Sequence, residues 1–180
     1  MLNHNIVYYT IINKKDIKCS NNNTLSDTKK AQLVLKEMLD YLNIKMPIIK
    51  IDSNGKPYFA KSNIYFNYSH TKNYIACAIS LANIGIDIEE KNREINDDIA
   101  RKYLDNAKTN LKRIETWVKK ESYSKLIGLG LQIKLQSINL NEITFKNFFI
   151  NKKEYLCSIY CDNNEAKLKI INIKLKLKML

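Results

Sequence analysis

Two acidic residues are placed so that they could hold a divalent cation. Asp87 and Glu89 alternate with isoleucines in Ile84–Glu89, and successive side chains of a strand point to opposite faces. The two carboxylates therefore share the face of Gly85, whereas Glu90 falls on the apolar side and is left out of the site. Neighbouring carboxylates repel each other unless a cation neutralises them. Oxygen ligands of this kind suit Mg²⁺, although an isolated pair also occurs on ordinary solvated strands.

A third carboxylate and a lysine fall on one ridge of a predicted helix. Trp117, Glu121 and Lys125 are spaced four residues apart, which places them on one helix face. Glu121 and Lys125 could therefore face the same cavity as the two strand acids. The plainer alternatives are a surface Glu121–Lys125 ion pair, worth about 0.3–0.5 kcal/mol, and a tryptophan that packs in the core.

Three further residues could bind a phosphate. Ser69 and His70 follow the apolar run Ile64–Tyr68, and we expect Ser69 to cap a short helical turn whose free N–H groups suit a phosphate. Lys56 lies in a Gly-Lys-Pro turn. Each residue also has a structural alternative: a simple N-cap serine, a half-buried histidine and a turn lysine.

The bulk composition is that of a globular protein with a basic surface. The chain has 180 residues, 45% of them hydrophobic and 27% charged, so it can bury a core. The formal net charge of +12 favours an anionic partner, although a Lys-, Asn- and Ile-rich composition accounts for part of it. The four cysteines form no CxxC pair, and the sequence shows no signal pattern or membrane-length apolar run. We therefore expect a cytoplasmic protein with reduced cysteines and no membrane contact.

Hydrophobic periodicity predicts an α+β order of elements. Ser26 is a plausible helix N-cap, and Gly128 is placed to end a later helix. We expect two halves, residues 1–90 and 91–180, each with a helix packed on a mostly antiparallel sheet. The predicted helices cover residues 26–42, 96–104 and 109–127, and the predicted strands cover residues 6–12, 48–51, 64–68, 74–81, 84–89, 143–150, 155–161 and 166–177.

Several segments occur in the order and rough spacing of one known family. They are Gly55–Pro57, Phe66–His70, Gly85–Glu89, Trp117–Lys125 and Gly128–Leu131. This ordered set resembles the 4′-phosphopantetheinyl transferases, specifically the single-chain, surfactin-synthetase-activating class. Any one of the segments is a weak signal, whereas the ordered set, which covers the middle of the chain, is specific.

The resemblance implies a fold, a reaction and partners. The expected fold has two similar α+β halves related by a pseudo-two-fold axis, with coenzyme A in the cleft between them. In the implied Mg²⁺-dependent reaction, a serine hydroxyl of an acyl or peptidyl carrier protein attacks the β-phosphate of coenzyme A. Phosphopantetheine is transferred and 3′,5′-ADP leaves. The implied enzyme acts as a monomer.

The resemblance also implies roles for residues at matching positions. Mg²⁺ would be held against the pyrophosphate by Asp87, Glu89 and Glu121, and Lys125 would contact the phosphates. The 3′-phosphate and adenosine end of coenzyme A would be held by a serine, a histidine and several lysines: Lys56, Ser69, His70, Lys29 and Lys30.

Two departures from the family pattern leave questions open. The family often carries a glutamate that can take the proton of the serine, shortly after the helix expected at residues 96–104. Lys108 stands at about that position here. A metal-bound water or Asp105 could replace the glutamate, or the enzyme could be slow. The basic segment that helps to hold the 3′-phosphate is also reduced.

Two other functions compete with an active transferase. The missing glutamate suggests a coenzyme A-binding protein that has lost turnover. The high positive charge suggests a nucleic-acid-binding module, but the sequence carries no recognised nucleic-acid signature, and its aromatic residues do not interleave with Lys and Arg. We therefore do not expect nucleic acid to be a partner.

Overall fold

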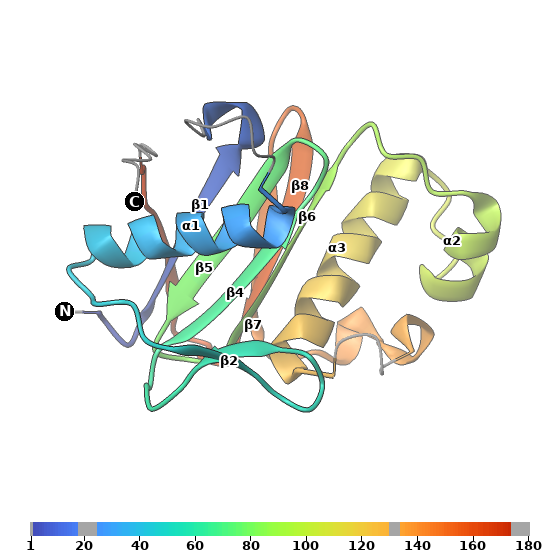
Figure 1. The fold of residues 1–180 in the computed structure, drawn as a ribbon. Coiled ribbons are helices and arrows are strands. Elements are labelled where there is room, and N and C mark those ends of the chain that lie inside the picture. Colours follow the sequence, from blue (N-terminus) through green and yellow to red (C-terminus); the bar gives the residue numbers. More distant parts are fainter. Residues whose placement is uncertain (1, 18–24, 130–133, 174–180) are drawn as a thin grey trace.

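The protein is built from two stacked β-sheets with a helix on the outer side of each. The computed structural model describes residues 2–17, 25–129 and 134–173, and α1 (Asp27–Tyr41) crosses the outer face of the first sheet. The long helix α3 (Asn110–Ile127) packs on the second sheet, with the short helix α2 (Asp97–Tyr103) beside it (Figure 1). The α+β class is thereby confirmed, whereas the pseudo-two-fold relation stays a prediction.

The strands form two main sheets and one short hairpin. The first sheet has the order β4-β5-β1-β9 and the second has the order β6-β8-β7. The strands are β1 (Ile6–Asn13), β2 (Ile49–Ile51), β3 (Pro57–Phe59), β4 (Tyr65–His70), β5 (Tyr74–Ser80), β6 (Ile84–Glu90), β7 (Lys146–Asn151), β8 (Tyr155–Cys161) and β9 (Lys167–Ile170). Short 3₁₀ turns cover Lys14–Asp16, Leu135–Ser137 and Leu140–Glu142.

Three apolar clusters hold these layers together. The buried face of α1 packs on one face of the first sheet, the other face of that sheet packs on the second, and a smaller cluster lies between α2 and α3. Ser26 caps α1 by accepting from the Lys29 N–H at 3.3 Å, as predicted. Gly128 ends α3 with a φ of 75°, the left-handed conformation that glycine adopts without steric cost.

Some sequence predictions fall beyond what the structure describes. Cys19, Gly130–Leu131 and the final part of the strand predicted over residues 166–177 lie outside the described residues. Cys77, Cys157 and Cys161 are buried free thiols. Within the described residues, no helix is both long enough and apolar enough to cross a membrane.

Strand β9 joins the two ends of the described chain in one sheet. It lies parallel to β1, with Ile6 opposite Lys167 and Tyr9 opposite Ile170. The first sheet therefore contains strands from both residues 1–90 and residues 91–180. The β9 strand ends at Ile170, well before the end of the strand predicted over residues 166–177.

The two sheets also meet along the edge strands β4 and β6, through side chains. The Asn67 side-chain oxygen of β4 accepts from the Ile86 N–H of β6 at 3.0 Å. Further along, Ser69 donates to Asp87 at 2.7 Å and Thr71 donates to Glu90 at 2.6 Å. The prediction that Ser69 caps a helical turn is wrong, because β4 runs through His70 and the serine hydroxyl is used to bridge the strands.

A glycine lets α3 lie directly on β6. A Cβ atom at Gly85 would fall 2.1 Å from the Ser122 carbonyl oxygen and 2.3 Å from the Leu126 backbone nitrogen. Both atoms belong to the helix backbone, so any side chain at this position would push the helix away from the strand. The contact is reinforced by the Ser122 hydroxyl, which donates to the Ser158 hydroxyl of β8 at 2.8 Å.

We predict that Gly85→Ala destabilises the protein by about 3 kcal/mol, because the added methyl group meets backbone rather than a movable side chain. Urea unfolding of the two proteins measures the difference. Gly55→Ala is the control: Gly55, unlike Gly85, has a positive φ, but its Cβ would meet nothing within 4 Å, so the expected cost is only about 1 kcal/mol. Equal losses in the two variants would contradict the close-packing explanation.

Candidate active site

Asp87 is the centre of a small polar cluster between β4, β6 and α3. Its side chain is nearly inaccessible to solvent, and its Oδ1 atom accepts from Lys125 Nζ at 2.6 Å and from the Ser69 hydroxyl at 2.7 Å. Lys125 Nζ also lies 3.0 Å from the Ser69 oxygen. The second carboxylate oxygen, Oδ2, is buried and has no hydrogen-bond partner among the described residues. Asp87 therefore retains one oxygen that can bind a further positive group.

Glu89 lies two residues further along the same face of β6. Arg93 donates to its carboxylate, and the Arg93 guanidinium carbon lies 4.6 Å from the centre of the Trp117 ring. Burial, followed by the charge of Asp87, raises the pKa of Glu89 to about 7. The ionised form of Glu89 is thus disfavoured unless additional positive charge reaches it.

Glu121 of α3 belongs to the same electrostatic group. Burial raises the pKa of Glu121, and the Asp87 carboxylate raises it further. Within the described residues, Glu121 has no ion pair, although Lys125 and Arg93 partly offset the repulsion. The structure therefore brings the three predicted acids close enough to influence one another, from two elements that Gly85 holds in contact.

The three carboxylates suit a hard cation, although they do not form a ready metal centre. The described residues contain no group of three or more His, Cys, Asp or Glu side chains that could hold a metal ion as they stand. The unpartnered Asp87 Oδ2 and the raised pKa values of Glu89 and Glu121 nonetheless indicate unmet demand for positive charge. All of the donors are carboxylate oxygens, the atoms that Mg²⁺ prefers.

Glu90 has a separate, structural role. Its buried carboxylate accepts from the Thr71 hydroxyl and from the Asn73 N–H, at 2.6 and 2.8 Å. Burial alone would raise the pKa of Glu90, but the hydrogen bonds from Thr71 and Asn73 outweigh it, so the pKa is lowered. This carboxylate fixes the turn after β4 and lies outside the acidic group, in agreement with the strand alternation.

Lys56 lies at the C-terminal end of α3. Its Nζ donates to the Leu126 carbonyl and to the Asn83 side chain, both at 2.9 Å, and burial lowers its pKa. With Lys125 and Tyr68 it lines a cavity of about 180 Å³. Lys56 thus shares a cavity with Lys125, the lysine bound to Asp87.

A second basic group surrounds Asp27 at the start of α1. The Asp27 carboxylate lies 2.7 Å from Lys14 Nζ, 3.7 Å from Lys30 Nζ and 3.6 Å from His70 Nδ1. The pKa of His70 is lowered, chiefly by burial. The structure thus brings together His70 and Lys30, two of the residues expected to hold the 3′-phosphate and adenosine end of coenzyme A. Lys14 was missed, because it follows β1 and no short motif links it to the start of α1.

Asp105, which could replace the missing glutamate as proton acceptor, forms an ion pair with another residue. Asp105 Oδ1 accepts from the fully buried Lys120 Nζ at 2.8 Å, and the same amine donates to the Tyr103 carbonyl at 2.9 Å. Lys120 therefore fixes the turn between α2 and α3, and Asp105 belongs to that structural ion pair. Lys108, at the position where the family glutamate is expected, is exposed.

Taken together, the fold and the site define an α+β protein with two kinds of binding group where its sheets meet. Carboxylates from β6 and α3 suit a hard cation, and lysines with a histidine beside β4 suit an anionic ligand.

Comparisons with known proteins agree with this description. Residues 83–171 match the model of the 4′-phosphopantetheinyl transferase superfamily. A protein of Aneurinibacillus migulanus named 4′-phosphopantetheinyl transferase gsp is 32% identical over 151 residues, which make up 77% of this chain and 59% of that protein. A Bacillus subtilis protein named 4′-phosphopantetheinyl transferase is 33% identical over 104 residues, 50% of this chain and 45% of that protein.

The resemblance seen in the sequence is therefore confirmed: residues 83–171 match the 4′-phosphopantetheinyl transferase superfamily, and both relatives carry that name. The matched stretch contains β6 and α3, and hence all three acids and Lys125. The chain spans only about half of the length of the curated relatives it matches.

We predict that Glu89→Gln stabilises the metal-free protein at alkaline pH. The pKa of Glu89 is higher in the folded protein than its ordinary value of 4.5, so the folded state holds a proton that the unfolded state has lost. Stability from this group is complete below 4.5 and is lost as the pH rises to about 7. The variant should therefore be more stable by about 1–3 kcal/mol near pH ~8 and nearly equal near pH ~4.

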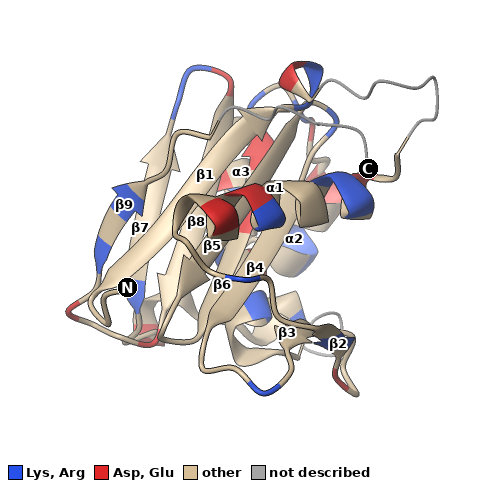
Figure 2. Ribbon diagram, turned by 60° about the vertical axis from the view of Figure 1, so that its left-hand side comes forward, with Lys and Arg blue, Asp and Glu red and all other residues tan. Residues whose placement is uncertain are grey.

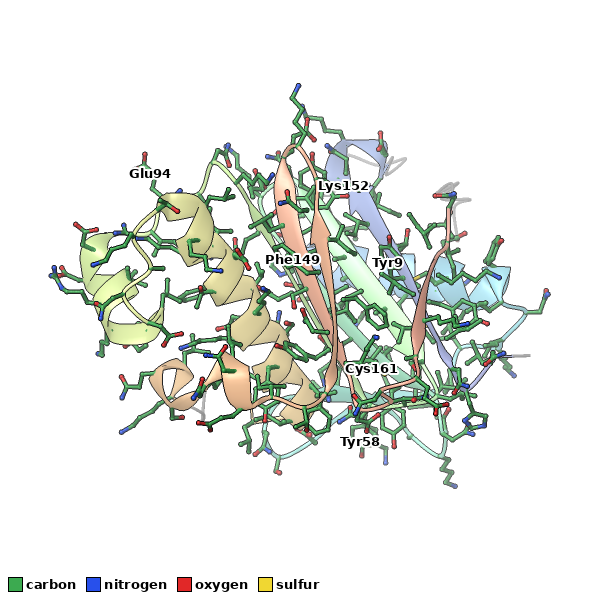
Figure 3. The ribbon with its side chains drawn as sticks, turned by 180° about the vertical axis from the view of Figure 1, so that it is seen from behind. Tyr9, Tyr58, Glu94, Phe149, Lys152 and Cys161 are labelled. Atoms are coloured by element: carbon green, nitrogen blue, oxygen red, sulfur yellow. The ribbon has the colours of Figure 1, made fainter. Side chains whose placement is uncertain are left out.

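Thermal or urea unfolding in the presence of a chelator, repeated across this pH range, measures the effect. Glu94→Gln is the matched control, because Glu94 (Figure 3) is exposed in the loop after β6 and takes part in no ion pair among the described residues. If the gain in stability of Glu89→Gln did not change with pH, the pKa of Glu89 would not be raised by its surroundings.

Proposed function

We propose that this protein is a Mg²⁺-dependent 4′-phosphopantetheinyl transferase that acts on a serine of an acyl or peptidyl carrier protein. The observation that carries the proposal is the placement of Asp87, Glu89, Glu121 and Lys125 in one group, within the stretch that matches the superfamily. Two of these residues come from β6 and two from α3, so the group exists only when the helix packs on the strand.

The acidic group would hold Mg²⁺ through Asp87, Glu89 and Glu121, with the free Asp87 Oδ2 as one available ligand. Bound there, the ion would offset charge on the pyrophosphate of coenzyme A and on the departing 3′,5′-ADP. Lys125 already lies at the boundary between the acids and the cavity beside Lys56. Its ammonium group would bind and orient the phosphates for attack by the serine hydroxyl.

The basic group around Asp27 would receive the 3′-phosphate of coenzyme A. Lys14, Lys30 and His70 come from three separate parts of the chain and converge on that single carboxylate. A phosphate with two negative charges would bind the ammonium groups of Lys14 and Lys30, which Asp27 only partly neutralises, and would accept a hydrogen bond from His70. Lys14 is thereby added to the residues proposed for this end of the substrate.

The distribution of charge also suits an acidic carrier protein. Lys and Arg are found on α1, on β9 and in several loops, in addition to the residues close to the acids (Figure 2). A net charge of +12 attracts a polyanionic substrate and an acidic partner over distances of about one Debye length.

We predict that Glu121→Gln lowers the rate of transfer by about 10²–10³-fold, because it removes one of the proposed charged ligands without changing side-chain size. The assay incubates the protein with coenzyme A, Mg²⁺ and an apo carrier protein, and follows the added phosphopantetheine by intact-mass spectrometry. Glu115→Gln is the control, since Glu115 lies on the same helix but pairs with Lys119 at 2.6 Å. No mass gain by the wild-type protein with several carriers would refute the proposal.

We also predict that Lys30→Gln weakens coenzyme A binding by about tenfold, whereas Lys29→Gln has little effect. The two lysines are neighbours on α1, but only Lys30 lies near Asp27, while Lys29 is exposed. Calorimetric titration with coenzyme A and with 3′-dephospho-coenzyme A separates the contribution of the 3′-phosphate to the affinity from that of the rest of the ligand. If Lys30→Gln weakened both ligands equally, the 3′-phosphate would not be bound at this group.

A coenzyme A-binding protein without turnover is the second candidate. The observation that favours it is the exposed Lys108 at the expected position of the glutamate, together with the ion pair that holds Asp105 on Lys120. Tight binding of coenzyme A without any mass gain on the carrier would support this alternative over the first.

A further inference from the structure

Arg93 is paired with Glu89, one of the proposed metal ligands. It lies four residues after Glu89, just beyond β6, and its guanidinium donates to the Glu89 carboxylate. The guanidinium is held on a second side by the ring of Trp117, at 4.6 Å from its centre. The Arg93 side chain is 35% exposed and that of Glu89 is 18% exposed, so the pair lies at the border of the solvent.

Both acids of β6 are thus paired with cations of the chain itself. Asp87 is paired with Lys125 at 2.6 Å, and Glu89 is paired with Arg93. A divalent cation that uses Glu89 as a ligand must compete with the guanidinium for the same carboxylate. The positive charge of Arg93 also favours the ionised form of Glu121, so its influence extends over the acidic group.

We propose that Arg93 is a positioning residue that holds Glu89 in the absence of metal and releases it when a divalent cation binds. This inference rests on the metal site of the proposed function and names a residue that the family resemblance did not include. In this arrangement the guanidinium preserves the acidic group before the substrate arrives, at the expense of metal affinity.

The backbone of Arg93 is fixed independently of its side chain, as such an exchange requires. Its N–H donates to the Glu90 carbonyl at 3.0 Å, and its carbonyl accepts from the Asn110 side chain at 2.8 Å. A cavity of about 310 Å³, lined in part by Lys72 and Arg93, adjoins the ion pair. The guanidinium can therefore leave Glu89 while the loop stays in place.

The chain contains a built-in reporter of this exchange. Trp117 is its single tryptophan, and the Arg93 guanidinium lies over its ring. If Mg²⁺ takes Glu89 from Arg93, the surroundings of the ring change and the tryptophan emission should change with them.

The test is Mn²⁺ binding in the presence of coenzyme A, measured from the loss of the free-ion signal in electron paramagnetic resonance. Arg93→Gln is expected to bind Mn²⁺ about tenfold more tightly than the wild type, because the competing charged hydrogen bond is gone. Lys72→Gln is the control for a general loss of positive charge, since Lys72 lines the same cavity without pairing with Glu89. Its affinity should stay within about twofold of the wild type.

A parallel titration with Mg²⁺ follows the tryptophan emission, which should change in the wild type and stay constant in Arg93→Gln. The wild-type measurement needs no variant, so it remains decisive if Arg93→Gln does not fold. Unchanged or weaker Mn²⁺ binding by a folded Arg93→Gln would overturn the exchange, as would metal binding by the wild type with constant emission. Failure of the wild type to bind Mn²⁺ at all would instead overturn the metal site and with it the proposed function.

Discussion

The contact between the backbones of β6 and α3 at Gly85 determines the rest of the site. With only hydrogen in place of a side chain, the strand approaches the helix close enough for Glu121 and Lys125 to face Asp87 and Glu89. The buried Ser122–Ser158 hydrogen bond fills the same interface with small polar groups. Three carboxylates this close together repel one another. Their arrangement is therefore held by the packing of α3 on β6 and not by attraction among the acids.

Electrostatic compensation explains how the fold tolerates this arrangement. One acid is paired with a lysine from the helix and a serine from β4, and another is paired with an arginine stacked on Trp117. The third acid, Glu121, has no ion pair among the described residues, and the pKa values of both Glu89 and Glu121 are raised. When the proposed substrate binds, a metal ion and phosphates would replace these internal partners. The free-energy cost of bringing the acids together is therefore offset within the folded protein before the ligand binds.

Much of the site could be predicted from local spacing, because strand alternation and helix periodicity fix which side chains share a face. The pairing of Asp87 with Glu89 and the helix ridge of Glu121 and Lys125 both follow from such periodicities. Ser69 was misjudged, because a serine after an apolar run fits a helix cap as well as a strand, and only the neighbouring β6 decides between them. Lys14 and Arg93 were not found, since their roles depend on contacts across loops that have no period.

The fold was predictable to a similar extent. Helices with clear caps, such as α1 after Ser26 and α3 before Gly128, lie close to their expected bounds. The parallel pairing of β9 with β1 joins positions about 160 residues apart, and no local pattern reports it. That pairing also orders events during synthesis. The outer edge of β1 stays open until residues 167–170 leave the ribosome, so until then the nascent chain carries an unpaired strand edge that is available to aggregation or to chaperones.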